Sequence, residues 1–397
     1  MKVEFDQQRT PSMLVSPDTR SGSYLQIIEQ MEMVNLMKSC TLVCLETKGR
    51  PSRFRYVIGS SRYPDYEKWG TIMVENQAFA LLYNLPLLLA SSLSALILRP
   101  RIIVANGVIS SLGPLLVKPI LDCHVILGYH GETSRYVRRS IVRLFRRLLS
   151  NRIDFAIANS EGGKSDLSLL VDPHRIEVLK SVLTPVFFAK RDREAIRKKL
   201  HVDGKFLVFY AGWLNQEKRC HKLLEAIGGL ASKGKFEFYF AGAGALEGEI
   251  KKLASGRDDV KFLGFISDSE RLAELYNAAD LVWGIADTTY LARSGVEALA
   301  CGTPIFVPLV PGVLKKAQAG VRVPTTLIPK SIGWVIDDED VDSLRALLTQ
   351  LSTSSQTDNM REACRTFAEQ ICHDQAEVYR RTLEGRVYRM SVRGRFA

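Results

Sequence analysis

The chain has 397 residues, of which 46% are hydrophobic and 24% charged, with seven cysteines and a net charge of +11. This length exceeds what one hydrophobic core usually serves, so we expect two domains, and the composition excludes a disordered or fibrous protein. The cysteines are scattered, odd in number and without a CxxC pair, which argues against a disulfide framework and for a reducing, cytoplasmic compartment. The N-terminal MKVEFDQQRT lacks an apolar core, so no secretory signal is expected there.

Short β-rich runs alternate with helical segments in the first half, as in parallel sheets that are covered by helices on both faces. Strands are expected at 12–16, 41–46, 101–107, 124–130, 155–160 and 175–183. The following segment, 182–205, is polar, basic and turn-rich, and we interpret it as the linker into a second domain.

The first half also contains an uncharged stretch, residues 76–98, which is long enough to cross a bilayer. Asn84, Pro86 and three serines interrupt it, and a strand follows at once. A buried or interfacial helix is therefore the main prediction, and a transmembrane span is the alternative.

Seven arginines and no acid lie between Glu132 and Asp154. On a helix over 135–152, six of them would cover about half of the circumference, with apolar residues on the other side. One interpretation is a solvated face of a packed helix, and the other is a basic face on an anionic membrane surface. Nucleic acid is not predicted as a partner, because no aromatic residues or binding motif accompany the arginines.

The second half repeats the strand-helix alternation more regularly. Strands are expected at 206–212, 236–244, 260–266, 280–286, 303–308 and 333–338, and helices at 214–234, 246–255, 269–279, 295–302 and 341–351. The strands are nearly continuous apolar runs, as in sheets buried on both faces. We predict two doubly wound domains, with ligands at the carboxyl ends of the strands in a cleft between them.

One glycine-rich turn, FAGAG at 240–244, follows a strand and precedes a helix. It permits close approach of the backbone and offers amides to an anion, although such glycines also serve simply as turn residues. It lacks the spacing of a dinucleotide fingerprint or of a phosphate loop.

Five motifs in order, AGWLNQEKRCHKLLEAI, FAGAG, VKFLGFI, LYNAADLVW and GVEALACGTPIFVP, resemble the C-terminal domain of GT-B glycosyltransferases, in particular the retaining, nucleotide-sugar-dependent family 4. GYHGE and DFAIANSEGGKSDL extend the resemblance more loosely to roughly residues 100–385. It implies an α/β GT-B fold with two Rossmann-like domains facing across a cleft. The acceptor-binding domain would span 1–186 and the donor-binding domain 187–375, with a C-terminal helix at 376–397 packing back towards the first domain.

The resemblance also implies roles for residues in the second half. Glu297 would accept hydrogen bonds from the donor ribose hydroxyls, the alternative being a solvated helix-surface glutamate. Lys218 would contact the diphosphate, the alternative being a lone exposed lysine. Backbone amides near Ala292, Arg293 and Ser294 would lie beside the phosphates, where Arg293 adds a cation and Ser294 a hydroxyl.

Further roles are implied around the transferred sugar and the base. His130 would lie near the sugar as the catalytic residue, unless it is a structural histidine. Gly22 would belong to the loop that approaches donor and acceptor. Gly242 of FAGAG would approach the donor, and Phe265 and Ile266 would contact the nucleobase through their backbone.

Two positions depart from the family pattern. Thr289 stands where relatives carry the first glutamate of a Glu-x7-Glu motif, and Asp287 could replace that acid only if the loop shifts. Trp213, after Gly212, stands where relatives place an arginine that neutralises the diphosphate. Arg293 or Arg219 would have to restore that charge.

The implied reaction moves a sugar from a UDP- or GDP-sugar to an acceptor hydroxyl with retention of configuration, without a cofactor. Cations and helix amides would stabilise the departing diphosphate, which by analogy takes the acceptor proton. No metal is implied, because the acidic run at 337–340 lacks a matching ligand set. The acceptor would be lipid-linked or a glycan. A degenerate protein that binds nucleotide or glycan without turnover, and a GT-B epimerase or phosphorylase, remain as alternatives.

Overall fold

The computed structural model describes residues 12–16, 31, 40–46, 56–60, 77–129, 146–159, 161–179, 183–216, 218–230, 234–284, 286–287, 290–309, 328–337 and 340–379. The chain divides into two compact units. The first comprises Met1–Val182 and Asp374–Ala397, and the second comprises Leu183–His373. The proposed domain boundary at 186/187 lies close to this division, and most of the proposed C-terminal segment 376–397 lies outside the described residues.

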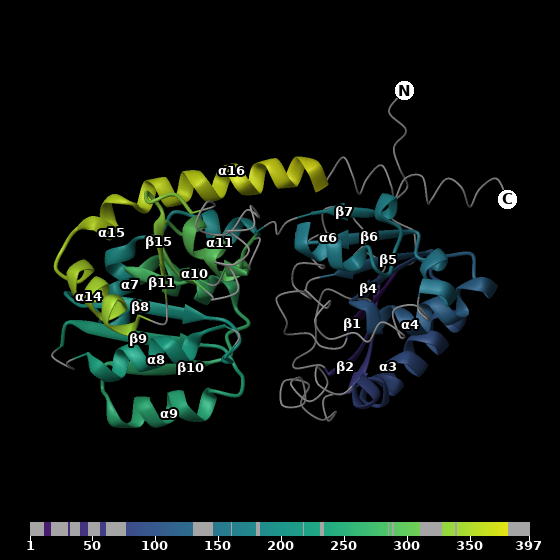
Figure 1. Ribbon diagram of the computed structural model, residues 1–397, viewed down its shortest axis with the longest axis horizontal. Helices are drawn as coiled ribbons and strands as arrows, with labels where there is room; N and C mark the ends of the chain where they lie inside the picture. Colours follow the sequence, from purple (N-terminus) through teal and green to yellow (C-terminus); the bar gives the residue numbers. More distant parts are fainter. Residues whose placement is uncertain are drawn as a thin grey trace. The chain divides into compact units, whose positions relative to one another are not determined.

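Each unit contains one parallel sheet (Figure 1). The first has the strand order β3-β2-β1-β4-β5-β6-β7, and the second has the order β10-β9-β8-β11-β14-β15. The first sheet is formed by β1 (Ser12–Ser16), β2 (Cys40–Glu46), β3 (Tyr56–Ser60), β4 (Ile102–Asn106), β5 (His124–Tyr129), β6 (Phe155–Ala158) and β7 (Ile176–Val178). The second is formed by β8 (Phe206–Ala211), β9 (Phe236–Ala241), β10 (Val260–Gly264), β11 (Leu281–Trp283), β14 (Ile305–Leu309) and β15 (Gly333–Asp337).

Helices connect these strands. In the first unit they are α3 (Gln77–Leu98), α4 (Val108–Val117) and α6 (Glu161–Leu167). In the second they are α7 (Arg193–Leu200), α8 (Cys220–Gly229), α9 (Glu247–Gly256), α10 (Ser269–Ala278), α11 (Arg293–Ala300), α14 (Val341–Leu351) and α15 (Gln356–Asn359), and α16 (Arg361–Tyr379) crosses the division between the units. The predicted pair of doubly wound α/β sheets is therefore confirmed.

The central strand β8 shows why the second sheet is covered on both faces. Phe206, Val208 and Tyr210 pack into a core with residues of α8, α9 and α14. Leu207 and Phe209 alternate with them and pack into the opposite core, with residues of α7, α10, α11 and α16. Because successive side chains of a strand point to opposite faces, one uninterrupted apolar run builds both cores.

Three expectations differ from the structure. The predicted linker contains α7, whose N-cap Asp192 accepts a hydrogen bond from the Ala195 amide at 3.0 Å, so the second unit begins within it. The strand β3 was not predicted, because YVIGS is short and interrupted by glycine. The helix predicted from residue 214 begins only at Cys220, which leaves 212–219 as a loop after β8.

The predicted helix at 76–98 is α3. Within the residues that the structure describes, no helix is long and apolar enough to cross a membrane. Helix α3 packs against α4, where the Ser92 hydroxyl donates to Gly113 O at 3.1 Å. Of the predicted basic helix 135–152, only 146–152 are described, and 146–148 are helical.

Candidate functional site

The topology of the second sheet defines where a ligand would bind. From β8 the chain moves outward through β9 and β10, then returns to β11 on the other side of β8 and continues to β14 and β15. In open parallel sheets, ligands bind beyond the carboxyl ends of the strands where the order reverses. The segments that follow β8 and β11 therefore flank the expected position, and they contain the predicted residues Gly212, Trp213, Lys218, Arg293, Ser294 and Glu297.

The loops after β8 and β9 are bound to each other through their backbones. Gly212 N donates to Ala241 O at 3.0 Å, Leu214 N donates to Ala243 O at 2.9 Å, and Leu246 N donates to Leu214 O at 2.9 Å. The Tyr210 hydroxyl donates to Trp213 O at 2.5 Å. The backbone around Trp213 is thus fixed from the sheet side.

The two FAGAG glycines, Gly242 and Gly244, are explained by this contact. A Cβ at Gly242 would lie 1.9 Å from Gly212 O, and one at Gly244 would lie 2.5 Å from Leu214 O. Their φ angles of +145° and +151° also disfavour any other residue. Close packing of the two loops therefore requires both glycines, whether or not a ligand approaches Gly242.

The Lys218 loop is held by Asn215. The Asn215 side-chain oxygen accepts the Lys218 amide at 2.9 Å, and the Cys220 thiol donates to Asn215 O at 3.4 Å. Arg219 adopts the left-handed conformation immediately before α8, with φ +55°. Lys218 is half-buried, and no described residue accepts a hydrogen bond from its ammonium group or forms an ion pair with it.

The turn after β10 carries the predicted base contacts. Gly264 has φ +68°, and its carbonyl accepts the Gly242 amide at 2.9 Å, which joins this turn to the β9 loop. Phe265 is 43% exposed, whereas Ile266 packs against the core that contains α10 and α11. Gly212, Gly242, Phe265 and Ile266 therefore lie at neighbouring strand ends of one sheet edge.

A short antiparallel hairpin follows β11, formed by β12 (Ala286–Asp287) and β13 (Tyr290–Leu291). Asp287 pairs with Tyr290 in this hairpin. Thr289 lies outside the described residues, so the position that departs from the family pattern is not described. The hairpin leads directly into α11, which begins at Arg293 after Ala292.

The first turn of α11 offers backbone amides. Gly295 N and Val296 N both donate to Ala292 O, at 2.9 and 3.2 Å. The amides of Arg293 and Ser294 precede the first intrahelical hydrogen bond, and such amides, together with the helix dipole, favour an anion.

Glu297 lies one turn further into α11 and is held at both carboxylate oxygens. The Arg293 Nε–H donates to its Oε1 at 2.7 Å, and the Tyr276 hydroxyl donates to its Oε2 at 3.0 Å. The residue is only 7% exposed, so the alternative of a solvated surface glutamate is wrong. Each oxygen retains a lone pair for a further donor, such as a ligand hydroxyl.

Tyr276 is the residue that sequence reasoning missed. It is fully buried on α10, with its ring edge-on to Phe209 at 5.2 Å between centroids, and its carbonyl accepts the Thr303 hydroxyl at 2.6 Å. Burial, reinforced by the neighbouring Glu297 carboxylate, raises the pKa of Tyr276 well above its ordinary value. It therefore remains a proton donor to Glu297 at any physiological pH.

The first unit has a corresponding reversal between β1 and β4. There Asn106 Nδ2 donates to Ser16 Oγ at 3.0 Å, which links the carboxyl ends of the two strands, and Gly107 follows with φ +92°. The predicted residues Gly22 and His130 follow β1 and β5 in the chain, and both lie outside the described residues.

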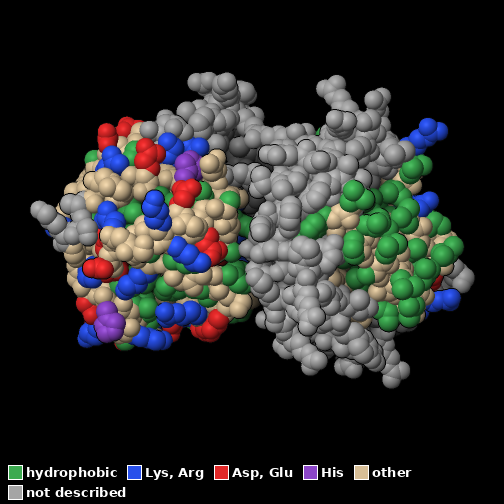
Figure 2. All heavy atoms as spheres, turned by 90° about the horizontal axis from the view of Figure 1, so that it is seen from below, with side chains coloured by type: hydrophobic (Ala, Val, Ile, Leu, Met, Phe, Trp, Pro, Cys, Tyr) green, Lys and Arg blue, Asp and Glu red, His purple; other side chains and the backbone are tan. Residues whose placement is uncertain are grey.

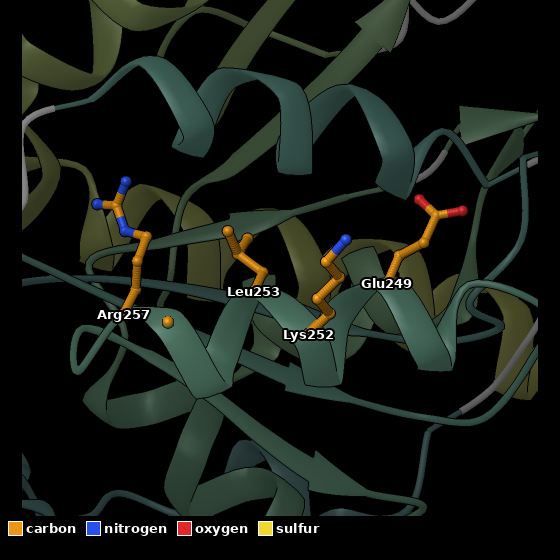
Figure 3. Close-up of a pocket in the computed structure, with 5 residues that line it drawn as sticks. Glu249, Lys252, Leu253 and Arg257 are labelled. Atoms are coloured by element: carbon orange, nitrogen blue, oxygen red, sulfur yellow. The ribbon is translucent and has the colours of Figure 1, made fainter.

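Other candidate sites are weaker. In the described part of the chain, no cluster of three or more His, Cys, Asp or Glu side chains could hold a metal ion. A hollow of about 330 Å³ lies on α9, where Glu249, Lys252, Leu253 and Arg257 point to the same side (Figure 3). Arg257 pairs there with Asp259 and donates to the carbonyl of Ile227, at 2.7 and 2.6 Å, so its charge is already neutralised within the fold.

Comparisons with known proteins identify what the second unit is similar to. Residues 192–371 match the family model of the glycosyl transferases group 1. A GDP-mannose-dependent alpha-(1-6)-phosphatidylinositol dimannoside mannosyltransferase of Mycobacterium tuberculosis is 28% identical over 140 residues, which cover 34% of this chain and 36% of that enzyme. An alpha-D-kanosaminyltransferase of Streptomyces kanamyceticus is 24% identical over 257 residues, 57% of this chain and 65% of that enzyme. The matches thus span less than two thirds of these relatives.

Solved structures cover more of the chain. The Anabaena protein HepE, crystallised with UDP and glucose, superimposes with a TM-score of 0.70 at 16% identity, covering 95% of this chain and all of that one. The sucrose-phosphate synthase of Thermosynechococcus elongatus gives a TM-score of 0.68 at 16% identity, covering 95% of this chain and 100% of that one. The predicted GT-B fold is confirmed by these likenesses.

Proposed function

Because residues 192–371 match the family model of the glycosyl transferases group 1, we propose that this protein transfers a sugar from a nucleoside diphosphate-sugar to an acceptor hydroxyl. The observation that carries the proposal is the buried Glu297, held by Arg293 and Tyr276 one turn behind the first amides of α11. We assign the carboxylate to the ribose hydroxyls of the donor and the helix N-terminus to its diphosphate.

Each group then has a role in binding the donor. Glu297 accepts the ribose hydroxyls with its remaining lone pairs. The amides of Arg293 and Ser294 and the ammonium group of Lys218 stabilise the charge that develops on the departing diphosphate. Lys218 suits this role because its ammonium group forms no ion pair with a described residue that would have to break when the donor binds. The loop that contains Phe265 and Ile266 lies at the same edge of the sheet, where its backbone would contact the nucleobase.

Retention of configuration and membership of family 4 belong to the same proposal, with His130 near the sugar and the diphosphate as the proton acceptor. Relatives and structural neighbours support a UDP- or GDP-sugar: one relative is GDP-mannose-dependent and HepE binds UDP. We propose a lipid-linked or glycan acceptor, since the same relative acts on a phosphatidylinositol dimannoside. A cytoplasmic location fits the seven free, buried cysteines.

Turnover of a donor panel tests the proposal. Purified protein is incubated with UDP- and GDP-sugars and released nucleotide is measured, with proton NMR reporting the configuration of the product. We expect one donor to be consumed, and the Glu297→Ala variant to lose at least tenfold in activity. A double variant, Lys218→Ala with Arg293→Ala, should weaken donor binding, whereas Lys252→Ala on α9 should not.

The degenerate alternative is favoured by Trp213, which leaves the β8 loop without the arginine of relatives. It predicts nucleotide binding that depends on Glu297, together with no turnover of any donor. Full donor affinity in the Lys218 and Arg293 double variant would refute the proposed diphosphate site.

A further inference from the structure

Helix α3 presents an apolar stripe to the solvent. Leu82, Leu85, Leu89, Leu93 and Ile97 are spaced three or four residues apart and are 70%, 44%, 58%, 59% and 71% exposed. At about 100° per residue, these five side chains fall within roughly a third of the circumference of the helix. We call them the α3 stripe.

The opposite side of α3 is buried and is partly polar. Asn84, Ser91 and Ser94 are each at most 6% exposed, as are Leu87 and Ala95 beside them. Small side chains there allow close packing on α4, since a Cβ at Gly113 would lie 2.2 Å from Ser91 Oγ. When the outer side of a helix contacts only water, its polar residues face outward and its apolar residues face the core. Helix α3 shows the reverse, so the folding of the first unit does not explain the exposed stripe.

The apolar surface continues beyond α3. Leu116 at the end of α4 and Ile120 in the following turn are 52% and 73% exposed. Figure 2 shows hydrophobic side chains gathered in one broad field on this unit, with lysine and arginine side chains at its margin. Contiguous apolar surface of this kind marks an interaction site.

Exposed arginines lie next to α3 and α4. Arg99 and Arg101 follow α3 directly and are exposed, as are Arg146 and Arg147. The segment of Arg146 is attached near α4, because Arg152 Nη1 donates to Leu115 O at 2.8 Å. None of these four exposed arginines forms an ion pair with a described residue. Asp122 is the only acid between Gln77 and Tyr129.

We propose that the α3 stripe inserts into the surface of an anionic phospholipid bilayer, with Arg99, Arg101, Arg146 and Arg147 on the headgroups. The stripe itself consists only of aliphatic side chains, which offer no hydrogen-bonding group and no aromatic anchor. Protein interfaces are enriched in aromatic residues and carry a polar rim, whereas acyl chains require only apolar area. The exposed arginines supply the complementary charge. This inference is independent of the proposed transfer reaction and concerns α3 rather than the basic segment 135–152 as a whole.

Vesicle sedimentation tests it with the full chain. Vesicles of phosphatidylcholine with about a third of phosphatidylglycerol are compared with vesicles of phosphatidylcholine alone. We expect binding to the anionic vesicles, at least tenfold weaker for a Leu89→Glu, Leu93→Glu double variant. The matched control is Leu169→Glu, also an exposed leucine of the first unit, at 49% exposure, but outside α3 and α4; it should bind like the wild type.

Insertion is separated from electrostatic attraction by a probe on the stripe. All seven native cysteines are buried, so a Leu93→Cys variant can be labelled selectively with a polarity-sensitive dye. Insertion predicts a blue shift of its emission with anionic vesicles, and no shift for dye at Leu169→Cys. Unchanged thermal unfolding of the variants excludes misfolding as the cause.

Three results would overturn the proposal: no sedimentation of the wild type with either vesicle, binding of the double variant at wild-type strength, or binding without a blue shift. A dimer that dissociates in the Leu89→Glu, Leu93→Glu variant, without vesicle binding, would assign the stripe to self-association instead. None of these measurements needs a sugar donor, so they fail or succeed independently of the transfer activity.

Discussion

In the proposed donor site, two neighbours fix the Glu297 carboxylate. Tyr276 comes from α10 and Arg293 from α11 itself, and each donates to a different carboxylate oxygen. The carboxylate thereby stays in one orientation, which reduces the entropy lost when a ribose binds. The free energy of donor binding should therefore depend on a tyrosine that the donor does not touch.

Replacement of Tyr276 by phenylalanine tests this dependence. The variant loses one hydrogen bond to a charged group, roughly 1.5–3 kcal/mol. We expect the KM for the donor to rise about tenfold, with a smaller change in kcat, as measured by steady-state kinetics. Tyr239→Phe is the control, since that hydroxyl donates to Leu200 O at 3.3 Å, at the last residue of α7. Equal donor affinity in the Tyr276 and Tyr239 variants would show that Glu297 needs no such support.

Among the elements, the β8 and β9 loops depend on glycine for a steric reason. A Gly242→Ala substitution would bring Cβ against the Gly212 carbonyl, so we expect a loss of several kcal/mol in the free energy of unfolding, about 2–4 kcal/mol. Gly248→Ala on α9 is the matched control, because its Cβ would meet nothing within 4 Å. It should be neutral or stabilise by about 0.5–1 kcal/mol. Denaturant unfolding of both variants measures the difference, and equal stability would refute the contact.

The strands β5 and β6 are joined by Asp154, which accepts the Val125 amide at 2.7 Å and pairs with Lys118. Burial alone would raise the pKa of Asp154, but hydrogen bonds from His124 and Lys118 outweigh burial and lower it. Its contribution to stability is therefore present above the unfolded pKa of about 3.9 and is lost as the pH falls through the lower folded pKa.

The Asp154→Asn variant should accordingly melt at a lower temperature than the wild type at pH 7. The gap should shrink as the pH falls below about 4, where the carboxyl of the unfolded chain becomes protonated, and close as the pH passes through the lower folded pKa. Calorimetry at a series of pH values checks this, with Asp122→Asn as a control on an exposed acid. A gap that is independent of pH would show that Asp154 acts through its shape and not through its charge.

The sequence predicts elements whose signal is local. Apolar runs predicted nearly all of the described strands, and GVEALACGTP indicated Glu297 as a candidate because it resembles a motif of the GT-B glycosyltransferases. Tyr276 was missed because its partner lies 21 residues away and meets it only when α10 packs on α11. The composition of α3 likewise predicted a buried or interfacial helix, but which side chains face outward is decided by its packing on α4.

For the molecule as a whole, the fold alone does not define the chemistry, since one fold carries many functions. The proposal of sugar transfer therefore rests on the buried Glu297, with Lys218 and α11 following β8 and the β11 hairpin at the strand reversal of the second sheet. The membrane proposal concerns the other unit, where α3 lies. The two proposals, donor binding and membrane contact, therefore concern different units. We expect that each can be lost without the other.

A crystal structure of the protein with UDP or GDP bound would show whether Glu297 holds the nucleotide. We expect the ribose hydroxyls on Glu297 and the diphosphate between the first amides of α11 and Lys218, with Tyr276 still bonded to the carboxylate. A nucleotide bound elsewhere, such as in the hollow on α9, or one that leaves Glu297 without contact, would contradict it.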